Sequence, residues 1–279
     1  MKNTKAILTV LLIGAYAVFI YLYQSRTLAS FGVDWRETYY PAVTLLLQGE
    51  NPYQVPTLYN PVWSLLPLIP FAMAGEGVGE AALFFTAFGV YAWAARRLGG
   101  GPAGIIFFMA SPLIFYNLML GNIDWLVVLG FVIPPPIGLF LLVLKPQIGF
   151  APALFWAWQI YRRDGVAGVV RAFAPVGISM LVAVAVFGNW VSGRDDNLLN
   201  VEWNMSVFPY LIPVGLFLIY KSRDKINQAV SASPLFSPYL SLGTWSIAQL
   251  GVVTNPTLTL AITAGLWVLY FAMGAVFTQ

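Results

Sequence analysis

The chain has 279 residues with a mean hydropathy of +0.77, and only 9% of them are charged, against about 25% in a soluble domain, so the composition predicts an integral membrane protein. The formal net charge of +3 comes from lysines and arginines beside apolar segments, which argues against nucleic-acid binding. There is no cysteine and no histidine, so disulfides and histidine chemistry are excluded, and any proton transfer must use carboxylates, lysine or tyrosine.

The first apolar run covers residues 6–23 and follows Lys2 and Lys5. It is long enough to span a bilayer, and the two lysines place the N-terminus in the cytoplasm by the positive-inside rule. A cleaved signal peptide is the alternative, but the run exceeds the usual apolar region of about 7 to 15 residues in such peptides. We therefore expect a first transmembrane helix here.

The stretch 34–53, DWRETYYPAVTLLLQGENPY, places acids, an arginine and aromatics directly outside this first run. Within an outer loop at 26–60, residues 35–47 predict an amphipathic helix, bent at Pro41, that lies in the membrane interface. Ionisable groups beside a bilayer are costly and often mark a reaction site, which makes Asp34 a candidate for one. The alternative is that Asp34 only caps the following helix.

A series of further apolar blocks predicts an all-α fold, a polytopic transmembrane helical bundle of about eight to ten spans in a single domain, 1–279. Several blocks are too short to cross a membrane alone. The short pair that flanks Pro134, Pro135 and Pro136 indicates either broken helices around a cavity or a cytoplasmic proline turn between two short tilted spans. The blocks are 61–74, 81–95, 103–120, 125–133, 137–144, 148–161, 172–187, 207–220, 235–252 and 258–277.

Basic residues between these blocks indicate which loops face the cytoplasm. One such loop carries Arg162, Arg163 and Arg171, and a second carries Lys221, Arg223 and Lys225. The segment between them, 189–206, is consequently expected outside. The side on which Arg96 and Arg97 lie stays open, because placing them inside requires a single net crossing over residues 61–95.

Four polar islands interrupt the apolar background and predict the lining of one cleft: residues 34–53, the GNID of 121–124, the KPQ of 145–147, and 189–206 with its WNMS. Lys145 stands between two apolar blocks and therefore needs an anion or water as a partner. It either meets a phosphate or carboxylate of a lipid substrate or extends from a helix end to the interface.

Two further acidic positions have competing interpretations. Asp124 either faces the same cavity as Lys145 or caps a helix that begins at Trp125. Asp195 and Asp196 lie in a Gly-rich polar stretch, without other metal ligands at a suitable spacing, and predict a solvated loop. No metal site is expected.

The order of the islands resembles that of a known enzyme superfamily. After Asp34 come QGENPY, YNPVWSLLPLIP, GNID, KPQ, WNMS and SPLFSPYLSL, so the likeness extends from Asp34 to about Tyr239. This order is similar to that of bacterial membrane glycosyltransferases of the GT-C superfamily. It is most similar to glycosyltransferase family 87, which contains polyprenyl-phosphate-mannose-dependent mannosyltransferases and related arabinofuranosyltransferases.

The resemblance implies a GT-C-type enzyme in the plasma membrane that takes a sugar, mannose or another hexose or pentose, from a polyprenyl-phosphate donor. The acceptor would be a lipid or a glycan, and the active site would face the external side. The donor is a substrate, so no cofactor is implied, and the partners are membrane lipids, the donor and the acceptor.

The resemblance also implies roles for particular residues. Asp34 matches the family's proposed general base, and Lys145 or Arg36 would stabilise the departing phosphate. The family's G-Q-x-N pattern reads GNID here, and the role of a family histidine that this chain lacks is either absent or supplied by Tyr239. Donor or substrate contacts are implied for Lys145, Arg36, Tyr40, Asn122, Asp124, Asn204, Ser206 and Tyr239.

Two other functions remain open alongside the transferase. Broken helices and Lys145 among apolar blocks also suit a transporter or flippase for a lipid-linked solute. The missing histidine and the short chain also suit a non-catalytic membrane subunit that keeps a GT-C-like fold.

Overall fold

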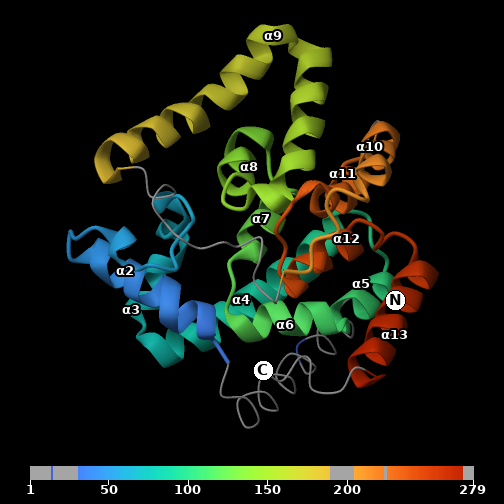
Figure 1. Cartoon of the computed structure of the whole chain (residues 1–279), viewed down its shortest axis with the longest axis horizontal. Helices are drawn as coiled ribbons and strands as arrows, with labels where there is room; N and C mark the ends of the chain where they lie inside the picture. Colours follow the sequence, from blue (N-terminus) through green and yellow to red (C-terminus); the bar gives the residue numbers. More distant parts are fainter. Residues whose placement is uncertain (1–13, 15–30, 189–203, 223–224, 273–279) are drawn as a thin grey trace, which may run out of the picture.

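The computed structural model describes residue 14 and residues 31–188, 204–222 and 225–272, and within them every regular element is a helix (Figure 1). The predicted all-α class is thereby confirmed. The longer helices are α2 (Tyr40–Leu47), α3 (Ile69–Met73), α4 (Glu76–Arg97), α5 (Pro102–Met109), α6 (Pro112–Leu120), α7 (Asp124–Gly130), α8 (Pro135–Leu142), α9 (Pro146–Phe187), α10 (Ile212–Lys221), α11 (Asn227–Ala232), α12 (Ser246–Leu250) and α13 (Pro256–Ala272). One short π-helix is present, η1 (Trp35–Tyr39). The short 3-10 helices are η2 (Pro52–Gln54), η3 (Val62–Ser64), η4 (Leu66–Leu68), η5 (Ser233–Phe236) and η6 (Leu242–Trp245).

Two helices of the described residues, α4 and α9, are long and apolar enough to cross a membrane. A third span results if α5 and α6, which meet at a 58° bend, are counted together. The expected first span at 6–23 lies outside the described residues, apart from Gly14. The structure therefore supports a membrane protein with two or three candidate spans, and the other apolar blocks form shorter helices.

Helix α9 is broken at Gly165, which has a φ of 67° and a ψ of −164°. Glycine adopts such a conformation readily because it has no Cβ, so the break separates α9 into two arms that diverge from the tip visible at the top of Figure 1. The sequence predicted a cytoplasmic loop marked by Arg162, Arg163 and Arg171. In the structure these residues stand on the two helical arms that meet at Gly165, and the connection between the arms is this single kinked residue.

The helical segment predicted at 35–47 is present as η1 followed by α2. The wide turn of η1 closes when the backbone N–H of Tyr40 bonds to the carbonyl of Trp35, immediately before Pro41. One side of the segment is buried against the protein and the other, with Arg36 and Glu37, is exposed. This arrangement is amphipathic, as the sequence predicted.

The short helices on either side of the triple proline, α7 and α8, pack against each other. Their backbones approach closely at two glycines: a Cβ on Gly138 would lie 2.6 Å from the carbonyl oxygen of Gly130. The ring of Trp156 covers Gly138 from the other side. In the structure the prolines stand at the start of α8, after a short turn from α7, and neither of these two closely packed helices is among the candidate membrane spans.

Candidate functional site

Four polar side chains from three distant segments meet inside the protein, and we refer to Asp34, Asn122, Asp124 and Lys145 as the carboxylate–lysine cluster. Asn122 Nδ2 donates a hydrogen bond of 2.7 Å to Asp34 Oδ2, and Lys145 Nζ donates one of 2.6 Å to Asn122 Oδ1. Lys145 Nζ also forms an ion pair with Asp124 Oδ1. Asp124 is fully buried and the Lys145 side chain is only 11% exposed, whereas Asp34 and Asn122 are partly exposed.

Two glycine turns bring Asp34 to Asn122. Gly121 ends α6 in the left-handed conformation, with a φ of 69°, and Gly32 has a φ of 68° and donates its N–H to the carbonyl of Met119 over 2.6 Å. A Cβ on Gly121 would lie 2.8 Å from the Cβ of Trp35, too close for any other residue. The chain before η1 can therefore lie directly against the end of α6.

Neither carboxylate acts as a helix cap. Asp34 occupies the position before η1, but its side chain accepts no hydrogen bond from that helix. Asp124 is itself the first residue of α7, and its backbone N–H is bound by Asn122 Oδ1 at 3.1 Å. The structure therefore does not support the interpretation of either Asp34 or Asp124 as a helix cap.

Asp124 depends on Lys145 for its charge balance. Its Oδ1 accepts no hydrogen bond from other groups of the described residues and faces the Lys145 ammonium. Its Oδ2 lies 3.5 Å from the hydroxyl of Thr244, at the limit of a hydrogen bond. Since this acid already neutralises Lys145, the lysine is not an isolated cation awaiting a substrate anion, and it does not extend to the surface.

A buried asparagine holds the chain beside Lys145 in place. Asn60 Nδ2 donates a 2.8 Å hydrogen bond to the carbonyl of Leu144, and the Tyr39 hydroxyl lies 3.4 Å from Asn60 Oδ1. The Tyr53 hydroxyl donates to the carbonyl of Asn60 over 3.1 Å. Asn60 thus joins the helix that follows Asp34 to the residue that precedes Lys145. Sequence reasoning missed this residue, although the YNP of the quoted motif contains it.

The cluster holds two carboxylates and one ammonium, and this imbalance affects Asp34. Burial raises the pKa of the Asp34 carboxyl, and the negative charges of Asp124 and Glu37 add to the rise, while Lys145 and the hydrogen bond from Asn122 oppose it. With Asp34 ionised the cluster carries one net negative charge. With Asp34 protonated it is neutral, so Asp34 is suited to accept a proton.

Tyr239 lies near both acids of the cluster. Burial raises the pKa of its phenol, and the charges of Asp34 and Asp124 raise it further, so the hydroxyl stays protonated at neutral pH. Its segment is held by the WNMS island: Asn204 Nδ2 donates to the Pro238 carbonyl over 3.0 Å and Ser206 Oγ donates to the Ser237 carbonyl. In the structure Asn204 and Ser206 therefore position the segment that carries Tyr239.

Arg36 and Tyr40, two further predicted contact residues, also lie outside the cluster. The Arg36 guanidinium donates to the carbonyl of Phe31 and lies 4.0 Å from the carboxylate of Glu80. The ring of Tyr40 packs on Trp35, with 5.7 Å between the centroids. The structure thus joins Asp34, Asn122, Asp124 and Lys145 and leaves Arg36 and Tyr40 with other partners. Asp195 and Asp196 lie outside the described residues.

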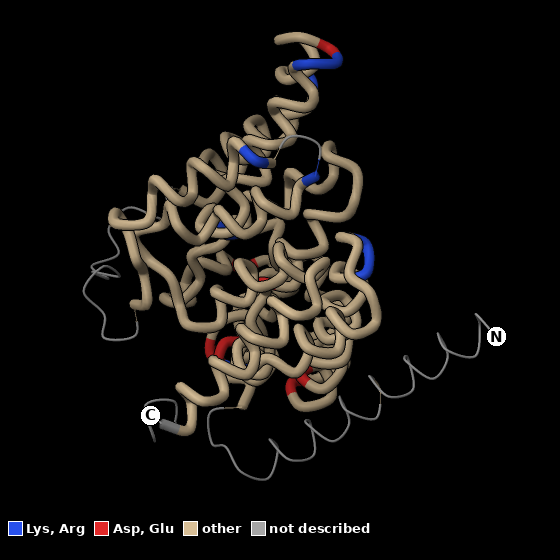
Figure 2. Tube along the Cα trace, turned by 90° about the vertical axis from the view of Figure 1, so that its right-hand side faces the viewer, with Lys and Arg blue, Asp and Glu red and all other residues tan. Residues whose placement is uncertain are grey.

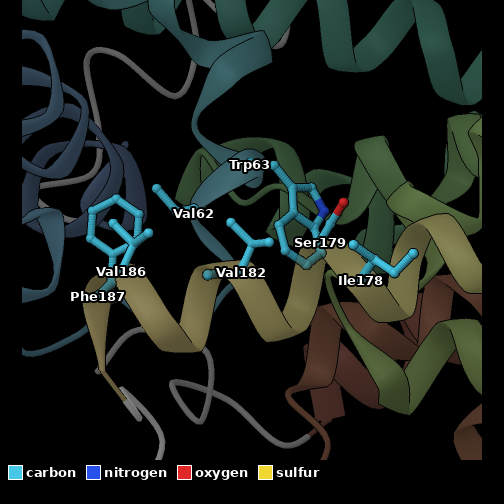
Figure 3. Close-up of a pocket in the computed structure, with 8 residues that line it drawn as sticks. Val62, Trp63, Ile178, Ser179, Val182, Val186 and Phe187 are labelled. Carbon is cyan, nitrogen blue, oxygen red and sulfur yellow. The ribbon is translucent and has the colours of Figure 1, made fainter.

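An apolar groove of about 210 Å³ lies between η3 and the second arm of α9 (Figure 3). At one end of the groove the ring of Phe187 contacts that of Tyr53, with 5.9 Å between the centroids, and the Tyr53 hydroxyl bonds to the carbonyl of Asn60. The lining residues are Val62, Trp63, Ile178, Ser179, Val182, Ala183, Val186 and Phe187.

The fold and this site define an all-helical protein, consistent with membrane insertion, that holds a carboxylate–lysine cluster among apolar helices. In the described part of the chain, no group of three or more acidic residues is placed to hold a metal ion. No family model, curated protein or solved structure matches the chain. The likeness to glycosyltransferase family 87 therefore rests on the order of the motifs.

Proposed function

We propose that the protein is a membrane glycosyltransferase of the GT-C type that transfers a sugar from a polyprenyl-phosphate donor to a lipid or glycan acceptor at the external face. The carboxylate–lysine cluster is the observation that carries this proposal. Three polar islands, 34–53, GNID and KPQ, which the family resemblance had already singled out, contribute side chains to one hydrogen-bonded group.

In the proposed reaction Asp34 is the general base. It takes the proton of the acceptor hydroxyl while the acceptor oxygen bonds to the anomeric carbon of the sugar. The bond from that carbon to the phosphate oxygen breaks, and the phosphate leaves with the bonding electrons. Asn122 orients the carboxylate through its 2.7 Å hydrogen bond.

The charge of the cluster suits this sequence of events. When Asp34 takes up the proton, the net charge of the cluster changes from −1 to zero while negative charge grows on the phosphate. A developing anion is more stable beside a neutral group than beside a negative one, so proton uptake favours departure of the leaving group. Lys145 contributes by neutralising Asp124, which would otherwise oppose the phosphate.

The membrane arrangement in this proposal is the polytopic bundle expected from the sequence. Residues 146–164 and 166–187, the two arms of α9, are each roughly 30 Å long, so each arm matches the hydrocarbon thickness by itself. The apolar groove of Figure 3, between η3 and the second arm, would receive the prenyl chain of the donor.

Transfer from a purified donor tests the proposal. The protein, in detergent or vesicles, is incubated with radiolabelled polyprenyl-phosphate sugars and extracted membrane lipids or glycans. We expect a labelled product with the unmodified chain and a loss of at least about a hundredfold in rate with Asp34→Asn, the scale of general-base catalysis. Glu50→Gln, which alters an exposed acid of the same outer segment, should retain activity. Absence of any product, or equal rates for Asp34→Asn and Glu50→Gln, would contradict the proposal.

A carrier of a lipid-linked solute is the second candidate. The specific observation in its favour is that Asp34, an acid with a raised pKa, stands beside a buried ion pair, as in sites that couple proton movement to transport. Reconstituted vesicles that hold a fluorescent prenyl-phosphate sugar would distinguish the two. Transbilayer movement without a new glycosidic bond favours the carrier.

A further inference from the structure

The exposed basic residues gather at one side of the molecule, although they come from four separate segments. Nine lysines and arginines belong to the described residues, and two of these, Arg36 and Lys145, pair with acids elsewhere. Figure 2 shows the remaining basic segments over the upper part and one flank of the molecule. They are Arg96, Arg97, Arg162, Arg163, Arg171, Lys221 and Lys225, and all are exposed. We refer to them as the basic surface.

One hydrogen bond ties the chain beside Lys225 to the end of α4. Asn227, at the start of α11, donates its Nδ2 to the carbonyl of Leu98 over 2.8 Å, which places the start of α11 beside the end of α4. The hydroxyl of Ser222 donates to the carbonyl of Lys225 over 2.8 Å, within the segment that connects α10 to α11. The segment that carries Lys225 therefore lies near Arg96 and Arg97 in the folded protein, although the two are far apart in the sequence.

Two of these basic side chains each lie over an aromatic ring. The Arg97 guanidinium stands 5.7 Å from the centre of the Trp93 ring, and the Lys221 ammonium stands 5.6 Å from that of Phe217. Trp93 and Phe217 are exposed at 42% and 56%. In both helices an exposed aromatic residue is followed, one turn later, by a basic residue at the helix end. This order is expected where a helix leaves the hydrocarbon core and enters the headgroup region.

The exposed acids lie at the opposite end of α4. Glu76 begins this helix, and the indole of Trp35 donates to the Glu76 carbonyl over 2.9 Å, which holds η1 and its exposed Glu37 there. Helix α4 has 22 residues, a length of roughly 33 Å, so the acidic and basic ends are separated by about one hydrocarbon thickness. Figure 2 shows the acidic segments at the lower end, apart from the acids inside the molecule and Asp164 beside Arg163.

We propose that the basic surface binds the anionic headgroups of the cytoplasmic leaflet and thereby orients the protein in the membrane. The basic surface carries many positive charges and only one neighbouring exposed acid, Asp164, so it complements a negatively charged leaflet. Each lysine or arginine near such a leaflet strengthens the attraction between protein and membrane. Helix α4 then crosses the bilayer once, with Arg96 and Arg97 inside and Glu76 outside. Asp34, which lies beside the Glu76 end of α4, faces the external side. The inference does not depend on sugar transfer.

Cysteine labelling tests the orientation, and the chain is suited to it because it contains no cysteine. Single variants Arg163→Cys and Glu76→Cys replace exposed residues, the first in the basic surface and the second at the acidic start of α4. In intact cells, a membrane-impermeant maleimide should label Glu76→Cys and should label Arg163→Cys only after the cells are opened. The reverse pattern, or equal labelling of both in intact cells, would overturn the orientation.

Lipid selectivity tests the partner. The protein is reconstituted in phosphatidylcholine vesicles with 30 mol% phosphatidylglycerol as roughly the anionic content of a natural leaflet, and energy transfer to labelled phosphatidylglycerol or phosphatidylcholine is compared. We expect a preference for phosphatidylglycerol that falls roughly fivefold per base when Arg97, Lys221 and Lys225 are each changed to Gln. A control variant at the acidic end, Glu37→Gln with Glu76→Gln, should keep the preference. An unchanged preference in the basic triple variant, with its elution volume on gel filtration also unchanged, would contradict the proposal.

Discussion

Asp34 is held where its ionisation is unfavourable, and this links the proposed chemistry to the stability of the protein. Its carboxyl is partly buried, one carboxylate of the cluster is already ionised, and a single lysine serves both. A base that must capture a proton and later release it benefits from such an environment, because a raised pKa strengthens the base. The same environment destabilises the folded protein whenever Asp34 is charged.

Replacement of Asp34 by Asn should therefore stabilise the protein at neutral and alkaline pH. Because the folded pKa is raised above the unfolded value, the stability that protonation of Asp34 contributes is complete at low pH and is lost as the pH rises through the folded pKa. The unfolding temperature of Asp34→Asn should exceed that of the unmodified chain at pH 8, and the difference should shrink at pH 4. A variant that is less stable than the unmodified chain at pH 8 would contradict this assignment.

Lys145 should matter to stability through Asp124. Lys145→Met leaves a fully buried carboxylate without its counter-ion, which we expect to cost about 3 to 5 kcal/mol. The double change Lys145→Met with Asp124→Leu removes both charges and should recover most of that loss in a denaturation assay, without recovering transferase activity. If the double variant is as unstable as the single one, the ion pair is not the interaction that Lys145 provides.

At the level of elements, two glycine turns and one buried asparagine determine where the cluster forms. The end of α6 and the start of η1 touch because Gly121 and Gly32 take positive φ angles. The start of α9 is tied to η1 because Asn60 bridges Tyr39 and the Leu144 carbonyl. The cluster thus depends on loops whose geometry is fixed by a few buried hydrogen bonds and close backbone contacts.

Gly121→Ala should disrupt this contact. The added Cβ would stand 2.8 Å from the Cβ of Trp35 at a backbone φ of 69°, so we expect a loss of stability of about 1 to 3 kcal/mol and a large fall in activity as Asp34 is displaced from Asn122. Gly89→Ala provides the control, since Gly89 lies within α4 and a methyl group added there would have no neighbouring atom within 4 Å. It should be neutral or slightly stabilising, and equal behaviour of the two variants would disprove the role of Gly121.

At the level of the whole molecule, α9 stands out because little of its apolar surface is covered by protein, as expected of a helix that faces lipid. Its second arm packs over η3 and so forms one wall of the groove. The groove therefore exists only because two segments separated by more than a hundred residues lie side by side.

Filling the groove should affect long donors more than short ones. In Val182→Trp the indole occupies space that a prenyl chain would take, so we expect KM for a long-chain polyprenyl-phosphate sugar to rise about tenfold, with less change for a donor with a short chain. Val184→Trp on the same arm, outside the groove lining, is the control. An equal effect of both variants on both donors would show that the groove does not hold the chain.

Part of the site could be predicted from residues alone. Asp34 and Lys145 were conspicuous because a charge among apolar residues needs a partner, and the GNID island lay next to an apolar block. Asn60, Tyr39 and Thr244 gave no comparable signal, since polar uncharged residues are common near membrane interfaces. Their importance follows from what they touch, which depends on the packing of distant segments.

The sequence by itself determined that this is an apolar, helical, membrane-type chain whose proton chemistry must use carboxylates, lysine or tyrosine, because composition sets the solvent a chain can occupy and the chemical groups it offers. Only the tertiary structure decided that Lys145 pairs with Asp124, that Asn122 joins them to Asp34, and that Arg96 and Arg97 share a surface with Lys221. Pairing of charges and grouping of helix ends depend on distances in space, which the glycine turns and the buried Asn60 establish for the cluster and the Asn227–Leu98 hydrogen bond establishes for the end of α4.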